Sequence, residues 1–413
     1  MMSHHLLELS ARLRLYNTCA VFLFGALALV VPSGYSVGVV MLLLGSGVLL
    51  INRPPLNLTR QDRLIIGVMV VYAVVSMAWA WWDGQGTRGF DKPSRFIFAV
   101  PVVLTIIAYP PRLSSLWAGL AVGAIGAGGW ASWQKLAEGA WRATGYTHVI
   151  QFGNLSMLMG ILCLAGLGWA SCQPRRLPWF VFMLLGAFMG ILGSLLSGSR
   201  GSWPSLPFVL VVLYISYGRQ LPGLIKGVLL ILLVTVGTSV YMVPQLGVQS
   251  RVHQAYDDVA RYASGENLRS SVGDRFEMWK GASHLIQEKP FLGWGQNGYQ
   301  DGMQSLADSG VINPYVTVYG HSHNDFIDTW AKRGLVGLIA LLALYLIPLR
   351  LFFGQLNHPN HDLRSLAVAG VLLPVAYINF GLSQAFLAHN SGVMMYAFLL
   401  AVLWGCFTVR AKT

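Results

Sequence analysis

Charged residues are scarce in this sequence. Of its 413 residues only 11% are Asp, Glu, Lys or Arg, whereas 55% are hydrophobic, and the mean hydropathy is +0.57. A soluble domain carries about 25% charged residues, so this composition disfavours a single water-soluble core. A bundle of helices in lipid accounts for it, and fourteen Trp and sixteen Tyr suit a protein that is anchored at two membrane interfaces.

Cysteines and cofactor motifs are also few. None of the four cysteines falls in the long polar segment of the chain, so neither a disulfide framework nor a cysteine-based metal site is expected. The sequence has no His-Glu-x-x-His or Asp-x-Asp pattern, no Walker sequence and no Rossmann glycine turn. We therefore expect no metal and no nucleotide cofactor.

Apolar runs long enough to cross a membrane dominate the rest of the chain. About 17 to 25 apolar residues make such a helix, and we predict an all-α membrane protein with about twelve transmembrane helices. The predicted organisation is spans one to nine in residues 1–243, a partly helical periplasmic loop in 244–322, and spans ten to twelve in 323–413. The twelve runs are 17–31, 35–51, 64–81, 94–109, 113–133, 149–172, 178–196, 203–217, 221–243, 326–353, 365–386 and 391–409.

Lys and Arg are distributed unequally over the two predicted faces of the membrane. With the N-terminus in the cytoplasm, the inner face carries fourteen basic and three acidic residues, and the outer face carries fourteen basic and thirteen acidic residues. The positive-inside rule then places both termini in the cytoplasm and the long loop in the periplasm. The net charge of +12 is therefore a topology signal that implies contact with membrane lipids, and no nucleic-acid partner is expected.

The long loop is predicted to contain two helices. Residues 249–263 and 271–288 have helical periodicity and are separated by a Ser-Gly-Glu-Asn breaker. A Lys-Pro pair ends the second helix. The remainder, which is rich in Gly, Asn and Tyr, is expected to be irregular as far as His321.

Two arginines are candidates for binding phosphate. Arg200 lies in a short outward turn, and Arg275 lies on the second loop helix, on the face that carries Trp279 and other apolar residues. A planar guanidinium can donate two parallel, charge-assisted hydrogen bonds to a phosphate group. Each arginine also has a structural interpretation: Arg200 could anchor in lipid headgroups, and Arg275 could pair with Asp274 or Asp257.

Two histidines mark the end of the long loop. Residues 322–325 (Ser-His-Asn-Asp) form a capping-box pattern with Asp in place of Glu, so the tenth helix is expected to begin here with His323 in its first turn. A helix N-terminus favours a neutral imidazole, which can accept a proton, and it attracts anions, whereas Asp325 favours the imidazolium. A structural role remains open for His323. It also remains open for His321, which either orients a substrate or caps the loop.

Three motifs in this region resemble the O-antigen ligase/polymerase family of bacterial membrane glycosyltransferases. They are HN-x-F-x7-G-x2-G starting at His323, R-x3-W starting at Arg275, and PFLGWG at 290–295. The resemblance covers roughly residues 190–340, and elsewhere it extends to the topology alone. Within the family, the fit is best to the ligases.

The resemblance implies transfer of an O-antigen glycan from undecaprenyl diphosphate to a sugar hydroxyl of lipid A–core, at the periplasmic face and without a metal. It also implies that Arg200 and Arg275 contact the diphosphate and that His323 is the catalytic histidine. A single displacement with His323 as general base inverts the anomeric centre. We further expect substrate contacts from His321, Asn324 and Trp279.

The chain departs from the family at two places. Many relatives have an acid where this chain has Lys332, which here can pair with Asp328 four residues away. Some ligases carry an Asp in the turn at 383–391, where the nearest polar candidates here are His389 and Asn390. We take His389 as a further substrate-binding candidate.

Other functions remain open at this point. An O-antigen polymerase or a protein O-oligosaccharyltransferase would use the same chemistry on another acceptor. A secondary transporter of twelve spans would place polar groups near the bilayer midplane, often in matched repeats. In this sequence the polar groups gather at one face, and the two halves of the chain show no repeat.

Overall fold

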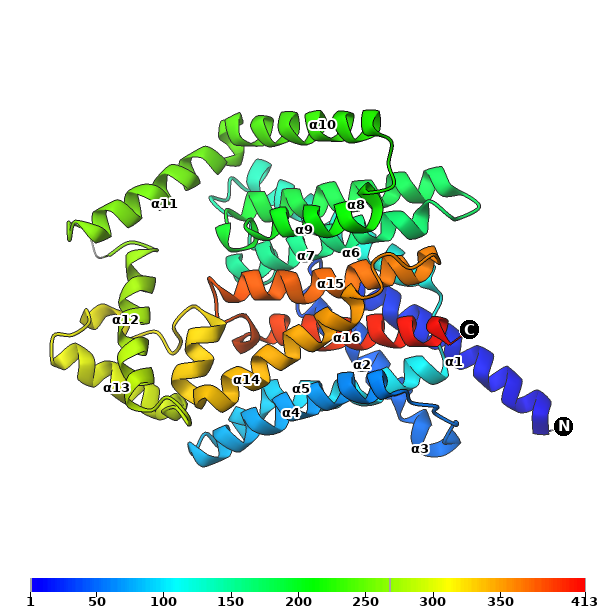
Figure 1. Ribbon diagram of the computed structural model, residues 1–413, viewed down its shortest axis with the longest axis horizontal. Helices are drawn as coiled ribbons and strands as arrows, with labels where there is room; N and C mark the ends of the chain where they lie inside the picture. The colour runs from blue at the N-terminus through cyan, green and yellow to red at the C-terminus, as the bar shows by residue number, and fades with distance from the viewer. Residues whose placement is uncertain (1, 267–268, 413) are drawn as a thin grey trace.

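A computed structural model describes residues 2–266 and 269–412 of the chain. Long helices run side by side in a bundle, and both ends of the chain lie at one end of it (Figure 1). The helices of the long loop lie at the opposite end; they are α11 (Val248–Ala263), α12 (Gly273–Glu288) and α13 (Gly295–Asp308). This arrangement has the form that the positive-inside rule predicts, with both termini on one side and the loop on the other.

The helices of the bundle follow the predicted apolar runs closely. Within the described residues, nine helical segments are long and apolar enough to cross a membrane, and they define an all-α, multi-pass membrane protein. Three predicted spans, in α1, α5 and α9, are not among these nine; α9 is a short helix that a π turn prolongs. The bounds are α1 (Met2–Ala26), α2 (Gly34–Ser46), α3 (Val48–Asn52), α4 (Arg60–Trp82), α5 (Asp91–Ala108), α6 (Leu113–Leu136), α7 (Val149–Ala170), α8 (Arg176–Ser197), α9 (Ser205–Leu213), α10 (Gly223–Met242), α14 (Asp325–Phe353), α15 (His361–Gly381) and α16 (Asn390–Ala411).

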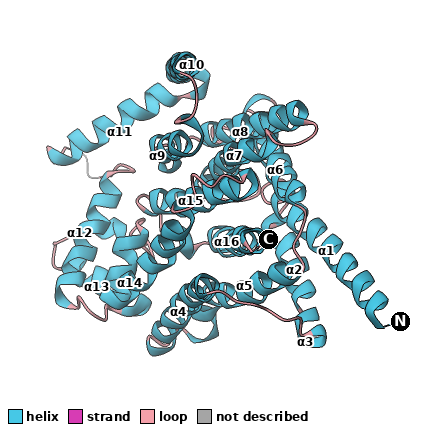
Figure 2. Cartoon of the chain, turned by 45° about the vertical axis from the view of Figure 1, so that its right-hand side comes forward, coloured by secondary structure: helices cyan, strands magenta, loops and turns pink. Residues whose placement is uncertain are grey.

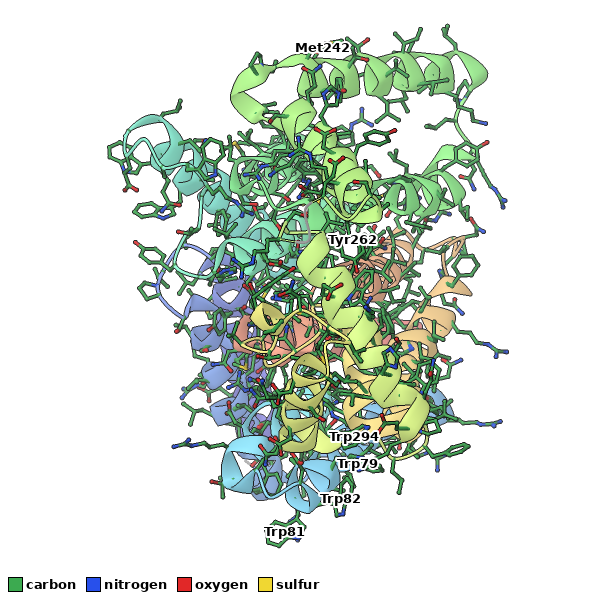
Figure 3. All side chains as sticks on the ribbon, turned by 90° about the vertical axis from the view of Figure 1, so that its left-hand side faces the viewer. Trp79, Trp81, Trp82, Met242, Tyr262 and Trp294 are labelled. Carbon is green, nitrogen blue, oxygen red and sulfur yellow. The ribbon has the colours of Figure 1, made fainter. Side chains whose placement is uncertain are left out.

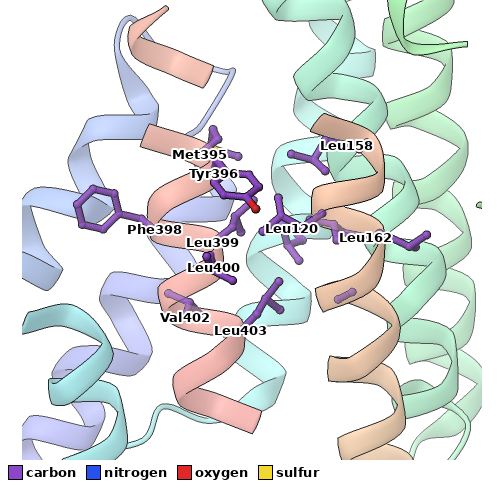
Figure 4. Close-up of a cluster of buried hydrophobic side chains, with 14 of the residues drawn as sticks. Leu120, Leu158, Leu162, Met395, Tyr396, Phe398, Leu399, Leu400, Val402 and Leu403 are labelled. Atoms are coloured by element: carbon purple, nitrogen blue, oxygen red, sulfur yellow. The ribbon is translucent and has the colours of Figure 1, made fainter. Parts of the chain in front are cut away.

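Helices α7, α15 and α16 form the centre of the bundle. Their apolar stretches are 83%, 89% and 94% buried, and Figure 4 shows side chains of α16 such as Leu399 meeting Leu120 and Leu158. Small residues allow close approach, because a Cβ on Gly190 of α8 would collide with the backbone of Gly160 on α7. By contrast, α10 stands at the margin of the molecule, and none of its apolar stretch is buried (Figures 1 and 2).

The loop between α10 and α14 contains one more helix than predicted. Both predicted helices are confirmed as α11 (Val248–Ala263) and α12 (Gly273–Glu288). The expectation of irregular chain beyond them is wrong, because residues Gly295–Asp308 form α13. Its first turn is capped from outside the loop: the Asp83 carboxylate accepts hydrogen bonds from the backbone amides of Gln296 at 2.7 Å and Asn297 at 3.0 Å. A cap that distant in sequence leaves no local signal.

The PFLGWG segment, residues 290–295, packs against a break in α14 and forms backbone hydrogen bonds with it. Gly334 has φ +62° and ψ −166° inside α14, and a Cβ there would collide with the Phe291 carbonyl group. The two backbones exchange hydrogen bonds, from Trp294 N to Ala331 O at 2.9 Å and from Leu335 N to Pro290 O at 2.9 Å. Trp79 of α4 also donates to the Leu292 carbonyl at 2.6 Å, and Figure 3 shows Trp79 beside Trp294. These glycines and aromatic residues therefore fix the position of the loop.

Candidate active site between two cavities

Four arginines line a cavity of about 270 Å³ at the loop end of the bundle, called here the arginine cavity. Arg200 lies in the short 3₁₀ turn after α8, and Arg275 lies on α12, so the structure brings together the two predicted phosphate ligands. Arg142, from the loop before α7, and Arg251, from α11, complete the set. Sequence reasoning missed these two, because only the fold places them here among the many outward-facing basic residues.

The arginine cavity is strongly positive. Burial and the charge of Arg251 lower the pKa of Arg200, and burial and the charge of Arg200 lower the pKa of Arg275. Burial, Arg251 and Arg200 together lower the pKa of Arg142 to about 10. In the described part of the chain none of the four forms an ion pair with a carboxylate, including Asp274 and Asp257. Such a cluster of cations requires an anion to offset its self-repulsion.

His323 lies just before α14, not in its first turn as predicted. The N-cap is Asn324, whose side-chain oxygen accepts hydrogen bonds from the amides of Phe326 at 3.0 Å and Ile327 at 3.1 Å. His323 itself has φ +52°, in the left-handed region that side chains other than glycine seldom adopt. A strained backbone held in place by its surroundings is a common feature of functional sites.

The imidazole of His323 is held neutral and in one tautomer. Burial, then the nearby charge of Arg275, lowers the pKa of His323 to about 4. Its Nδ1 contacts the side-chain oxygen of Gln384, and the Gln384 amide nitrogen lies 2.8 Å from Nε2 of His389. In this orientation of the Gln384 amide, its oxygen accepts from a protonated Nδ1 of His323, and Nε2 is left free to accept a proton. The turn near residue 383 drew attention in the sequence, but Gln384 itself was missed.

A second cavity of about 270 Å³ is lined by two histidines near His323 and is called here the histidine cavity. His321 and His389 both line it, and the His321 ring lies 4.2 Å from the ring of His323. Burial, then the charge of His323, lowers the pKa of His321 to about 4, while burial, then Lys92, lowers the pKa of His389 to about 4. His323 itself lines neither cavity, but it is a neighbour of both, because its ring lies beside His321 of the histidine cavity and the charge of Arg275 in the arginine cavity acts on it.

A buried ion pair holds residues 320–323 in place, a segment called here the histidine loop. Lys332 lies 2.8 Å from Asp328, which confirms the predicted pair, and it also donates to the Gly320 carbonyl at 2.8 Å. The Asp328 carboxylate accepts from the Ser322 amide at 2.9 Å. Both ends of the pair thus bind the backbone that carries His321.

Two predicted substrate contacts have structural partners here. Trp279 donates from its indole nitrogen to the Ser322 carbonyl at 2.9 Å, which ties α12 to the histidine loop. Asn324 caps α14 and donates to the Leu382 carbonyl at 3.2 Å. Their contact with a substrate stays a prediction. In the described part of the chain no group of three His, Cys, Asp or Glu is placed to hold a metal ion.

The fold and site together define a multi-pass membrane protein with a positively charged, histidine-containing site at one end of its helices. Residues 180–342 match a family model described as O-antigen ligase. This stretch includes Arg200, Arg275, His323 and the break at Gly334. The predicted resemblance to the O-antigen ligase/polymerase family is therefore confirmed over this stretch.

Two relatives illustrate the range of the similarity. An uncharacterized protein of Haemophilus influenzae is 28% identical over 379 residues, which cover 91% of this chain and 94% of that protein. The O-antigen ligase of Escherichia coli is 23% identical over 214 residues, which cover 51% of this chain and 48% of the ligase. The family match and the similarity to the Escherichia coli ligase support a membrane glycosyltransferase-like role of the ligase/polymerase type.

Proposed function

We propose that this protein transfers an O-antigen glycan from undecaprenyl diphosphate to a sugar hydroxyl of lipid A–core at the periplasmic face of the inner membrane. The observation that carries the proposal is that His323 has a neighbour in each cavity, with its ring 4.2 Å from the ring of His321 in the histidine cavity and with the charge of Arg275 in the arginine cavity acting on it. A transferase needs a donor and an acceptor that meet at one proton-accepting group. The family match over residues 180–342 supports the same chemistry.

The diphosphate of the donor binds in the arginine cavity. Arg200 and Arg275 contact it, and Arg142 and Arg251 add to the positive field. Donors placed in advance where charge develops stabilise the departing diphosphate as the bond to the sugar breaks. The guanidinium groups neutralise this leaving group without a metal ion.

His323 acts as the general base. As the acceptor hydroxyl attacks the anomeric carbon, its proton passes to Nε2 of His323, the bond from that carbon to the diphosphate breaks, and undecaprenyl diphosphate leaves. The single displacement inverts the anomeric centre. Because Arg275 contributes to the low pKa of His323, a bound diphosphate that neutralises Arg275 raises this pKa toward the working pH. Donor binding thus strengthens the base.

The orientation follows from the charge distribution. Both termini lie at the basic end of the bundle, which the positive-inside rule assigns to the cytoplasm. The two cavities lie at the opposite end and open to the periplasm. A secondary transporter would need its polar groups near the midplane, and the position of this site at one end favours transfer.

The acceptor distinguishes the ligase from its alternatives. The purified protein, supplied with lipid-linked glycan, lipid A–core and a metal chelator, should form glycosylated lipid A–core with the inverted linkage. Longer lipid-linked chains would identify an O-antigen polymerase, and a glycosylated protein acceptor would identify an O-oligosaccharyltransferase. No glycan transfer, together with substrate-dependent flux in proteoliposomes, would refute the proposal in favour of a transporter.

A further inference from the structure

The histidine cavity is rich in basic side chains. Arg88 from the 3₁₀ turn Gly86–Phe90, Lys92 from the start of α5 and Arg333 from α14 all line it. In the described part of the chain none of the three forms an ion pair within 4 Å, and the hydrogen-bond partners of Arg333 are the hydroxyls of Ser76, at 3.3 Å, and Tyr72. Three cations from three separate elements therefore face one space.

The acids near this cavity have other partners. Asp328 pairs with Lys332, which adds no net charge to the wall. Asp83 accepts hydrogen bonds from the first amides of α13 and from the Gln85 side chain. Asp91 pairs with Arg95 at 3.0 Å. Arg88, Lys92 and Arg333 thus give the cavity an excess positive charge that favours an anionic ligand.

The remaining wall suits a sugar at the membrane surface. Trp79 provides aromatic surface, while Gln85 and Gln296 provide amide groups that can bond to hydroxyls. Beyond the cavity, at the end of α4, Trp81 is 74% exposed and projects from the molecule (Figure 3). Exposed tryptophans of this kind mark the interface between lipid and water. The cavity therefore lies where a lipid-anchored saccharide presents the sugars closest to its lipid.

We propose that the histidine cavity is the acceptor subsite and that it recognises an anionic group on the acceptor saccharide, a phosphate or a sugar-acid carboxylate, through Lys92 and Arg88. The inference rests on the proposed function, in which the donor diphosphate occupies the arginine cavity. The anionic group binds away from the reacting hydroxyl and brings that hydroxyl to His323. Lys92 and Arg88 are then specificity-determining residues and not catalytic ones.

The test measures binding separately from transfer. Full-length protein in lipid nanodiscs is titrated with deacylated lipid A–core oligosaccharide in its native form, after removal of phosphates, and after reduction of its carboxyl groups. Lys92→Gln removes one cation and Lys92→Arg keeps it. Lys280→Gln is the matched control, because Lys280 is exposed on α12 and lines neither cavity.

A lost charge-assisted hydrogen bond should weaken binding of the native oligosaccharide about tenfold or more in Lys92→Gln. Lys92→Arg and Lys280→Gln should stay within about twofold of the parent protein. The effect of Lys92→Gln should vanish with whichever treated oligosaccharide lacks the recognised group, which tells phosphate from carboxylate. Equal binding of all three oligosaccharides to the parent protein, or an unchanged affinity in Lys92→Gln, would overturn the proposal.

Failure of the subsite and failure of the proposed function give different results. A parent protein that transfers glycan but binds all three oligosaccharides equally refutes only the anionic subsite. A parent protein that distinguishes them but forms no glycosylated product supports the subsite and refutes the transfer reaction.

Discussion

Gln384 offers a sharp test of how His323 is held in its reactive form. The side chain is only 2% exposed, and it contacts Nδ1 of His323 with its oxygen and His389 with its nitrogen. In Gln384→Leu the volume is nearly kept, but the Nδ1 proton of His323 loses its acceptor. Leaving one buried polar group without a partner costs about 1 to 3 kcal/mol. If that cost falls on the transition state, kcat drops by roughly 5- to 150-fold while the KM for the donor changes little.

Gln384→Glu tests the same contact through pH. A carboxylate beside Nδ1 favours the imidazolium and should raise the pKa of His323 from about 4 by about one to three pH units. The base must be neutral to accept a proton, so activity is present above this pKa and is lost as the pH falls through it. The acid limb of kcat/KM for the variant should therefore lie at higher pH than that of the parent protein.

Both effects are measured with purified protein, lipid-linked glycan and lipid A–core. Gln304→Leu, on the exposed face of α13, is a matched control that should behave like the parent protein. If Gln384→Leu turned over at the parent rate and the acid limb of Gln384→Glu did not move, Gln384 would not set the state of His323.

Three further predictions concern the parts around His323. Arg275→Lys keeps the charge but loses the planar fork, so the KM for the donor should rise about tenfold or more, whereas an unchanged KM would make Arg275 structural. Asp328→Ala leaves buried Lys332 without its counter-ion at a cost of about 3 to 5 kcal/mol, so Tm should fall by several degrees. Adding Lys332→Met removes the unpaired charge and should restore Tm. An unchanged Tm in the single variant would show that the pair does not hold the loop. Asp83→Ala removes the cap of α13 and should lower the stability of this helix by about 0.5 to 2 kcal/mol, so amide hydrogen exchange in 295–308 should become faster. Equal exchange in the variant and the parent protein would contradict this role of Asp83.

Much of the fold could be predicted, because the sequence patterns that indicate its helices lie within the helices themselves. Long apolar runs produce the helices of the bundle, and the loop helices α11 and α12 show clear helical periodicity. The helix α13 could not be predicted, since its cap comes from Asp83, more than two hundred residues earlier in the chain. Likewise, the break at Gly334 depends on the backbone of the PFLGWG segment, which only the folded loop brings there.

The candidate site was predictable where chemistry and motif coincide, as at Arg200, Arg275 and His323. Arg251 and Gln384 could not be found, because nothing in their neighbouring sequence separates them from other polar residues of the chain. The position of His323 also depends on tertiary contacts: Asn324 takes the N-cap, and the loop held by Lys332 keeps His323 outside the helix. The low pKa of the His323 imidazole has burial as its largest cause and the charge of Arg275 as the next, and both depend on the folded chain.

The most direct measurement compares the transfer rate of His323→Ala with that of the parent protein, using equal amounts of folded protein, donor and lipid A–core. A general base contributes about 10²- to 10⁴-fold to the rate, so the variant should lose at least about a hundredfold in kcat while still binding the donor. Transfer by His323→Ala within a few-fold of the parent rate would contradict the assignment of His323 as the base.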